Sequence, residues 1–315
     1  MAVADPQRIR ALGRVAVVFG GDSAERPISL KSGRAVLAGL QRAGVDAHGV
    51  DPSESGLMPF IEGRFDRAWL ALHGRGGEDG SIQGALASLG VPYTGSGVLG
   101  SALAMDKWRS KQLWRGAGLP TAAFARVTAA SELADAVHEV GFPMIVKPAR
   151  EGSSIGMSRV HDERELEQAW RTAADYDAAV LLERWIHGQE YTAAILDGRV
   201  LPVIRLETPR EFYDYAAKYE AGTTGYHCPC GLEESREREL GELCLKAFDD
   251  LGASGWGRVD FMLDDAGQPW FLEVNTIPGM TDYSLVPMAA AADGIGFDEL
   301  VLRILETSLA GEVSA

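Results

Sequence analysis

The sequence predicts an α/β protein in which a parallel-sheet unit is followed by two α+β units. Strand-like and helix-like segments alternate through the first third of the chain, which is the pattern of a parallel sheet with crossover helices. Near the C-terminus, two strand-like segments are separated only by Asp264–Gly267, which has the composition of a hairpin turn. This turn indicates that the later sheet contains antiparallel strands.

The parallel-sheet unit begins with the apolar run Arg14–Phe19, which predicts a strand that ends at two glycines. Apolar positions spaced between Ile28 and Leu40 predict a helix after it. Further strands are predicted at 47–50 and 67–72, the second of which runs into the glycine-rich loop His73–Gly77. Both glycine-rich loops therefore fall at the carboxyl ends of parallel strands, where such sheets bind ligands.

The two α+β units are predicted after Asp106, which can cap a helix that runs to Gly116. Small residues at 95–104 indicate a boundary before this helix. We therefore expect three domains, at residues 1–105, 106–188 and 189–315. Their further elements are strands at 142–147, 179–185, 191–196 and 200–206, helices at 163–174, 236–251 and 289–292, and hairpin strands at 256–263 and 269–275.

Composition is that of a globular protein that binds neither nucleic acid nor membranes. Its 315 residues are 46% hydrophobic and 24% charged, and the net charge of -15 opposes binding to phosphate backbones or anionic lipid. No stretch reaches the ~18 apolar residues of a membrane span, and the first residues lack a secretion signal. Only one residue separates Cys228 from Cys230, whereas zinc and thioredoxin-like sites have two or more. We expect a cytoplasmic protein with free thiols.

The segment Lys147–Gly156 (KPAREGSSIG) is predicted to bind phosphate, and we call it the lysine loop. The apolar run Phe142–Val146 predicts a buried strand, so that Lys147 lies at a strand end. Two glycines allow the backbone to approach a ligand, and Ser153 and Ser154 add hydroxyl donors. The lysine precedes the glycines, so this is not a Walker loop. The alternative is an ordinary strand and turn with a surface lysine.

The late hairpin carries polar side chains that suit a metal ion. Strand alternation places Arg258 and Asp260 on one face of the first strand, and Glu273 and Asn275 on one face of the second. With Asp264–Gly267 as the loop, we expect Arg258 opposite Glu273 and Asp260 diagonal to it. Two carboxylates and an amide that converge suit a hard cation such as Mg²⁺. The alternative is a solvated face on which Arg258 neutralises the acids.

These motifs resemble the ATP-grasp superfamily, and in particular its D-alanine:D-alanine ligase family. Matching blocks occur in order along nearly the whole chain: GGDSAERPISL from Gly20, ALHGRGGEDG from Ala71, YTGSG from Tyr93, MDKWRSK from Met105, VKPAREGSSIG from Val146, FYDYAAKY from Phe212, GWGRVDFML from Gly255, LEVNTIPGMT from Leu272 and SLVP from Ser284. The resemblance implies an ATP-grasp fold, in which a Rossmann-like N-terminal domain precedes two α+β domains that clamp ATP. It also implies a cytoplasmic homodimer that forms a C–N bond in peptidoglycan precursor synthesis.

In the mechanism that this resemblance implies, ATP phosphorylates the carboxylate of one D-alanine, and the amine of a second D-alanine attacks the acyl phosphate. The residues that would bind ATP lie in the lysine loop and in neighbouring segments. They are Lys107, Lys147, Ser154, Glu183, Trp185, Ile186, Glu190 and Lys218. Mg²⁺ or Mn²⁺, as two ions that bridge the phosphates, would be held by Asp260, Glu273 and Asn275.

The resemblance also implies the residues that bind D-alanine. Glu25 would receive the ammonium of the first D-alanine, and Ser153 and Tyr219 would orient it. Arg258 would stabilise charge on the phosphoryl group and on the tetrahedral adduct. The carboxyl groups of the substrates would be bound near His73 for the first D-alanine, and near Gly279, Ser284 and Leu285 for the second.

Three positions depart from the family pattern, and other activities compete with dipeptide synthesis. Pro27 is expected to stiffen its loop, Ala216 stands where an acid is usual, and Ile277 replaces a common serine. D-alanine:D-lactate or D-alanine:D-serine ligation is the alternative within the family, although the retained segment Ala217–Tyr219 favours the plain dipeptide. Nucleotide binding without catalysis is the alternative from another class, but no predicted lysine or metal ligand is missing.

Overall fold

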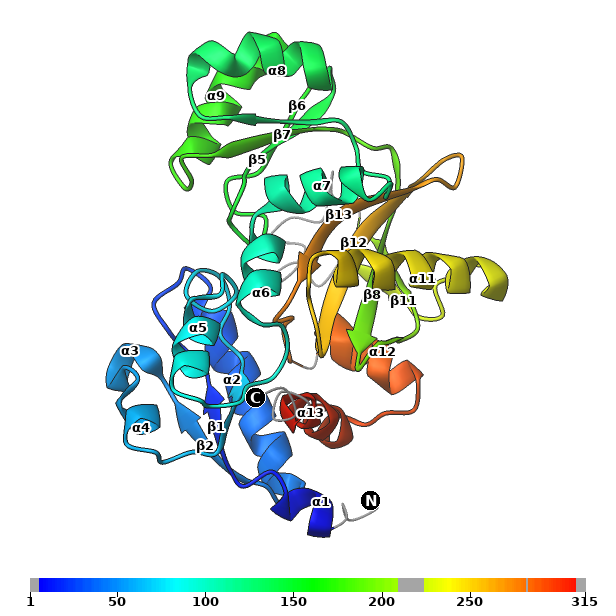
Figure 1. The fold of residues 1–315 in the computed structure, drawn as a ribbon. Coiled ribbons are helices and arrows are strands. Elements are labelled where there is room, and N and C mark those ends of the chain that lie inside the picture. Colours follow the sequence, from blue (N-terminus) through cyan, green and yellow to red (C-terminus); the bar gives the residue numbers. More distant parts are fainter. Residues whose placement is uncertain (1–5, 209–223, 282, 310–315) are drawn as a thin grey trace.

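The computed structural model describes residues 6–208, 224–281 and 283–309, which form three sheets with helices around them (Figure 1). The first sheet is parallel and has the strand order β2-β1-β3. Parallel pairing confirms the prediction made from alternating segments. The strands are β1 (Arg14–Val18), β2 (Asp46–Val50) and β3 (Arg67–Leu70), and the helices of this part are α1 (Pro6–Arg10), α2 (Arg26–Arg42), α3 (Pro52–Ser55), α4 (Met58–Ile61) and α5 (Ser81–Ser88).

The second sheet is antiparallel and has the strand order β4-β7-β5-β6. Helices α8 and α9 pack on it around an apolar cluster of their own, at the top of Figure 1. The observed α9 has the predicted bounds. The elements are β4 (Phe124–Val127), β5 (Met144–Pro148), β6 (Ser158–Val160), β7 (Val180–Arg184), α8 (Leu133–Val140), α9 (Glu163–Ala174) and the 3-10 helix η1 (Ala130–Glu132).

Helices α6 (Val98–Met105) and α7 (Lys107–Gly116) connect the first two sheets. The Asp106 carboxylate accepts a hydrogen bond from the Arg109 amide at 3.0 Å, which confirms the predicted helix cap. Segment 95–104, where we expect a domain boundary, contributes most of α6. Its small residues allow close packing, because a Cβ at Gly100 would lie 2.3 Å from the Gly252 carbonyl oxygen.

The third sheet has the strand order β11-β10-β8-β12-β13, with β9 also paired to β8. The strand predicted at 200–206 is divided into β9 and β10, because Pro202 between them has no N–H to donate. Helix α11 packs on this sheet. The elements are β8 (Gly188–Leu196), β9 (Arg199–Val200), β10 (Ile204–Glu207), β11 (Gly225–His227), β12 (Trp256–Asp264), β13 (Pro269–Asn275), α11 (Glu234–Asp250), α12 (Leu285–Ala292) and α13 (Phe297–Glu306).

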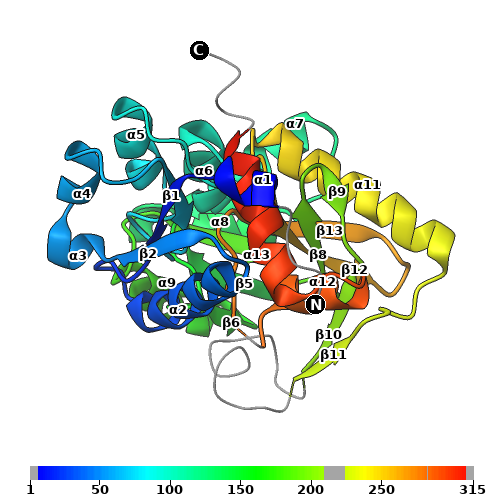
Figure 2. The same cartoon turned by 90° about the horizontal axis from the view of Figure 1, so that it is seen from below.

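Helix α13 returns to the N-terminal part of the molecule. It packs against α2, and Figures 1 and 2 show the two helices near each other. The Trp69 indole N–H donates to the Val301 carbonyl oxygen at 3.2 Å, and the rings of Trp69 and Trp256 are 5.3 Å apart. One hydrophobic core therefore combines residues from both ends of the chain.

The hairpin register predicted from the sequence is wrong by two residues. Arg258 lies opposite Asn275, and Asp260 lies opposite Glu273, whereas Arg258 was expected opposite Glu273. A shift by an even number of residues keeps each side chain on its face. The four polar side chains therefore still share one face of the hairpin.

Two local features cause this shift. The Asp264 amide donates to the Gln268 carbonyl oxygen at 3.1 Å, and the Asp264 carboxylate accepts from the amides of Ala266 and Gln268, so the turn is one residue tighter than expected. A β-bulge at Asp260 and Phe261 shifts the pairing by a second residue.

Three smaller expectations concern Pro27, the cysteines and membrane spans. Pro27 lies in the first turn of α2 and not in a loop, and there its missing N–H costs no hydrogen bond. Cys228, Cys230 and Cys244 are free thiols, as expected. Among the residues that the structure describes, no helix combines the length and apolar character needed to cross a membrane.

Candidate functional site

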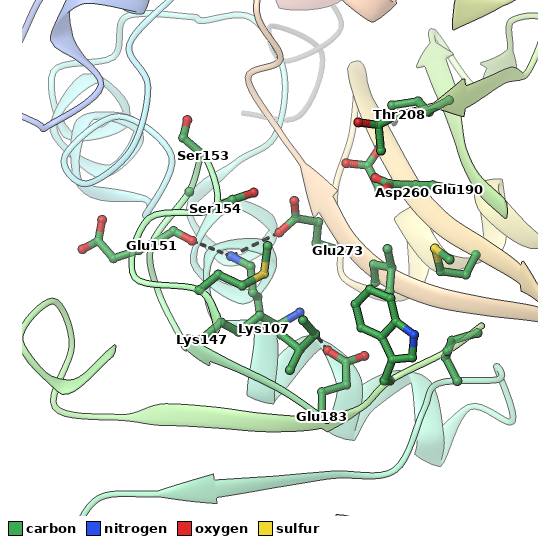
Figure 3. Close-up of a pocket in the computed structure, with 18 of the residues that line it drawn as sticks. Lys107, Lys147, Glu151, Ser153, Ser154, Glu183, Glu190, Thr208, Asp260 and Glu273 are labelled. Carbon is green, nitrogen blue, oxygen red and sulfur yellow. Dashed lines mark hydrogen bonds and ion pairs between the residues drawn. The ribbon is translucent and has the colours of Figure 1, made fainter. Parts of the chain in front are cut away.

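Two neighbouring cavities, of about 310 Å³ and about 850 Å³, contain the described residues that the sequence predicted for the site. We call them the small cavity and the large cavity. The small cavity lies between the lysine loop and the strands of the second and third sheets (Figure 3). The large cavity lies between α2, the loop after β3 and the segment after β13. The residues that line both are Lys107, Gly152, Ser153 and Glu273.

Two lysines point into the small cavity, and each is held by a carboxylate. Lys107 Nζ donates to the Glu151 carbonyl oxygen at 2.7 Å and lies 3.2 Å from Glu273 Oε2. Lys147 Nζ lies 2.7 Å from Glu183 Oε2 (Figure 3). One ammonium group comes from α7 and the other from β5. Two positive charges at one cavity suit a multiply charged anion.

The lysine loop has an unusual backbone between these lysines and the large cavity. Ser153 and Ser154 have φ values of 53° and 58°, in the left-handed region that few residues other than glycine adopt. Such conformations are retained where the surrounding structure enforces them, and they concentrate at ligand sites. Gly156 also has a positive φ, and a Cβ there would lie 2.7 Å from the Tyr176 ring.

The other walls of the small cavity suit a flat, partly polar group. The Arg159 guanidinium lies 4.2 Å from the ring centroid of Trp185, which holds this ring in place. Carboxylates of Glu183 and Glu190 lie at the same cavity. The apolar lining includes Ile145, Met157, Trp185, Ile186, Met262 and Leu272.

The acidic side chains of the hairpin, Asp260 and Glu273, come from facing positions of β12 and β13, and both line the small cavity. Asp260 accepts two hydrogen bonds from the Arg258 guanidinium, at 2.8 and 2.7 Å, and one from Thr192 Oγ1 at 2.6 Å. Glu273 and Asn275 line the large cavity. Within the described ranges, His, Cys, Asp and Glu alone form no group of three that could hold a metal ion. The donor set of two carboxylates and an amide still fits a hard cation that takes its remaining oxygen ligands from a substrate.

The large cavity contains Glu25 and His73 at its N-terminal side. Glu25, immediately before α2, accepts a hydrogen bond from the Ser153 hydroxyl. His73 is buried, and its Nε2 lies 3.2 Å from Ser32 Oγ. Burial lowers the pKa of His73 to about 4, and the charge of Arg258 acts in the same direction. The imidazole is therefore neutral near pH 7.

Glu78 is a site residue that the sequence analysis missed. It is buried, lines the large cavity and accepts a hydrogen bond from the Gly74 amide at 2.7 Å. Burial and the negative charge of Glu25 raise the pKa of Glu78 to about 8. Its position directly after the glycine-rich loop His73–Gly77 was a signal, but the sequence could not separate it from the neighbouring Asp79.

The far side of the large cavity is lined by Gly279, Ser284 and Leu285. Ser284 precedes α12, and its hydroxyl oxygen accepts from the Thr281 amide at 2.9 Å. A Cβ at Gly279 would lie 3.0 Å from this hydroxyl. The remaining predicted site residues, Lys218 and Tyr219, lie outside the described residues, as does the departure at Ala216.

Comparisons with known proteins show what this chain is similar to. The family model described as "D-ala D-ala ligase C-terminus" matches residues 113–306. The D-alanine--D-alanine ligase of Nitrosococcus oceani is 60% identical over 301 residues, which are 96% of this chain and 95% of that protein. The enzyme of the same name from Halorhodospira halophila is 60% identical over 307 residues, 98% and 99% of the two chains.

Solved structures of the same shape include two ligases with different second substrates in their names. D-alanine--D-alanine ligase from Bacillus anthracis complexed with ATP has a TM-score of 0.84 at 36% identity, covering 96% of this chain and 99% of that one. VanG D-Ala:D-Ser ligase from Enterococcus faecalis has a TM-score of 0.81 at 28% identity, covering 94% and 99%.

Proposed function

The chain belongs to the D-alanine–D-alanine ligase family and catalyses the ATP-dependent joining of two D-alanines, and we propose that its two cavities divide this reaction between them. ATP binds in the small cavity, and both D-alanines bind in the large one. The observation that carries this proposal is the position of Ser153, which lines both cavities and contacts Glu25. Phosphoryl transfer then takes place where the cavities meet. The product serves peptidoglycan synthesis.

In the small cavity, Lys107 and Lys147 bind the phosphates of ATP while the backbone at Ser154 closes over them. Adenine packs between the apolar walls beside Trp185 and Ile186. Carboxylates suit the ribose hydroxyls because they accept hydrogen bonds from them. The further residues proposed for ATP are Glu183, Glu190 and Lys218.

We assign two metal ions, Mg²⁺ or Mn²⁺, to Asp260, Glu273 and Asn275. When bound, such ions neutralise charge on the phosphates and orient the transferred group. Arg258 lies beside these ligands, and its guanidinium adds a fixed positive charge close to the point of transfer.

In the large cavity, Glu25 binds the ammonium group of the first D-alanine, and Ser153 and Tyr219 orient this substrate. Neutral His73, which lines this cavity, lies close to its carboxyl group. That carboxylate attacks the γ-phosphorus of ATP, and ADP leaves. The amine of the second D-alanine then attacks the acyl phosphate carbon, the amine loses a proton, and phosphate leaves. The carboxylate of this second D-alanine is bound by the backbone near Gly279 together with Ser284 and Leu285.

An assay with purified protein, ATP, Mg²⁺ and D-alanine tests the proposal. Phosphate release should depend on D-alanine and match the dipeptide formed, whereas L-alanine should not be turned over. Competition among D-alanine, D-serine and D-lactate across pH tests the second site, and D-alanyl-D-alanine should remain the main product. Equal turnover of L-alanine, or phosphate release that does not depend on D-alanine, would contradict the proposal.

We further propose that the enzyme acts in the cytoplasm as a homodimer, and that it binds neither nucleic acid nor membranes. The domain division at 1–105, 106–188 and 189–315 is part of the same proposal, with α13 packed on the first domain. Sedimentation velocity of the purified enzyme tests the dimer. A monomer at micromolar concentration would contradict it.

A further inference from the structure

Lys111 is a fully buried lysine that lines neither of the two cavities. It lies one turn after Lys107 on α7. Its ammonium group contacts the Glu183 carboxylate, Thr121 Oγ1 at 2.9 Å and the Phe271 carbonyl oxygen at 2.9 Å. Three oxygens match the three N–H donors of an ammonium group, so Lys111 is fixed between β7 and β13.

Lys147 contacts the same carboxylate but in a different setting. It lies against the second oxygen of Glu183, at 2.7 Å, and its side chain faces the small cavity. The side chain of Lys147 is 13% exposed, whereas that of Lys111 is 0% exposed. Glu183 therefore has one lysine that is enclosed and a second lysine that a ligand can reach.

The binding of ATP would change this arrangement. If Lys147 binds phosphate, as proposed above, its ammonium group is drawn away from Glu183 toward the phosphates, and the side chain of Glu183 is only 4% exposed. A buried carboxylate without a cation is strongly unfavourable, so the exchange requires a second positive charge that stays in place. We propose that Lys111 is a positioning residue, the permanent counter-ion of Glu183, which allows Lys147 to exchange this carboxylate for the ATP phosphates.

The electrostatic interactions among Lys111, Lys147 and Glu183 agree with this role. Burial raises the pKa of the Glu183 carboxyl, but the charges of Lys111 and Lys147 outweigh it and hold this pKa below its usual value. Burial lowers the pKa of Lys111 to about 8 although Glu183 opposes the shift, so that Lys111 remains mainly a cation near pH 7. The charges of Glu183 and Lys111 cancel each other, so Lys107 and Lys147 are left to bind the phosphates.

The test compares Lys111→Met with Arg115→Met, which removes an exposed cation from the same helix. We expect the dissociation constant for ATP, measured by calorimetry, to rise tenfold or more in Lys111→Met, because Glu183 then retains Lys147. Arg115→Met should bind ATP within twofold of the wild type, and the KM for D-alanine should change little in either variant. A folded Lys111→Met protein that binds ATP like the wild type would overturn the proposal.

A charge-rescue experiment separates this role from a purely structural one. The double variant Lys111→Met/Glu183→Gln has no uncompensated carboxylate, so it should fold and should bind ATP as well as Glu183→Gln alone. If Lys111→Met fails to fold, recovery of folding in the double variant supports the proposal. A double variant that also fails to fold, or that binds ATP no better than Lys111→Met, overturns it.

Lys147→Met distinguishes this inference from the proposal on which it rests. If Lys147→Met leaves ATP affinity unchanged, the role of Lys147 in phosphate binding is wrong. If Lys147→Met weakens ATP binding while Lys111→Met does not, only the counter-ion proposal is wrong.

Discussion

The Ser153 hydroxyl donates a hydrogen bond to the Glu25 carboxylate and thereby joins the lysine loop to the start of α2. The two residues are 128 positions apart in the chain. Ser153 also holds a left-handed backbone conformation, which is retained only where the surrounding structure enforces it. The position of the lysine loop is therefore linked to the carboxylate proposed to bind the first D-alanine.

Ser153→Ala should weaken the use of D-alanine without unfolding the protein. Hydrogen bonds to charged groups contribute about 1.5–3 kcal/mol, so we expect kcat/KM for D-alanine to fall about 10- to 100-fold. Phosphate release measured against D-alanine concentration gives this value, and circular dichroism during heating gives the stability. A change in kcat/KM of less than twofold would show that the contact does not serve substrate binding.

Glu273→Gln should reduce kcat by at least about 100-fold, because the neutral amide is a much poorer ligand for Mg²⁺. The side chain of Glu273 is 24% exposed, so the fold should survive the change. Phosphate release at increasing Mg²⁺ concentration measures the effect. The matched control is Glu239→Gln, which changes an exposed acid on α11 and should retain wild-type turnover. Turnover near the wild-type value in Glu273→Gln would refute the metal assignment.

Glu78 should make the stability of the protein depend on pH. Its folded-state pKa is raised from 4.5 to about 8, so the folded protein holds this proton more tightly than the unfolded chain does. The resulting stabilisation is complete below about pH 4.5 and is lost as the pH rises to about 8. Glu78→Gln keeps a neutral side chain at every pH. The difference in the free energy of unfolding between Glu78→Gln and the wild type should therefore shift in favour of the variant between pH 5 and pH 9. The shift should be on the order of a few kcal/mol.

Urea titrations of the wild type and of Glu78→Gln, each at pH 5 and pH 9, measure these free energies of unfolding. Since Glu25 contributes to the shift, Glu25→Gln should lower the pKa of Glu78 and weaken the pH dependence. An equal stability difference between wild type and Glu78→Gln at both pH values would mean that Glu78 is already ionised at pH 5.

The sequence alone predicts those parts of the fold that depend on local pattern. Apolar periodicity gives the bounds of α9, and strand alternation puts the polar residues of β12 and β13 on one face. The register between these strands could not be predicted, because it depends on how the Asp264 carboxylate tightens the turn and on a bulge at Asp260. Neither feature leaves a periodic signal.

For the candidate site, too, continuous motifs could be predicted from the sequence, whereas contacts between residues far apart in the chain could not. The lysine loop and hairpin are continuous motifs, and the site residues predicted from them line the two cavities. Glu78 and Lys111 were missed because their importance depends on partners far along the chain, Glu25 and Glu183. A buried charge has no recognisable sequence pattern until the fold brings its partner to it.

Gly152→Ala should selectively impair the binding of the first D-alanine. A Cβ at this position would lie 2.8 Å from Glu25 Oε2, closer than real side chains approach, so the carboxylate must move from the place where Ser153 holds it. We expect the KM for D-alanine to rise several-fold while the KM for ATP changes little. Gly116→Ala is the matched control, because a Cβ there meets no atom within 4 Å. Steady-state kinetics with each substrate varied in turn measure both constants, and an equal rise in both would mean that the substitution disturbs the whole lysine loop and not Glu25 alone.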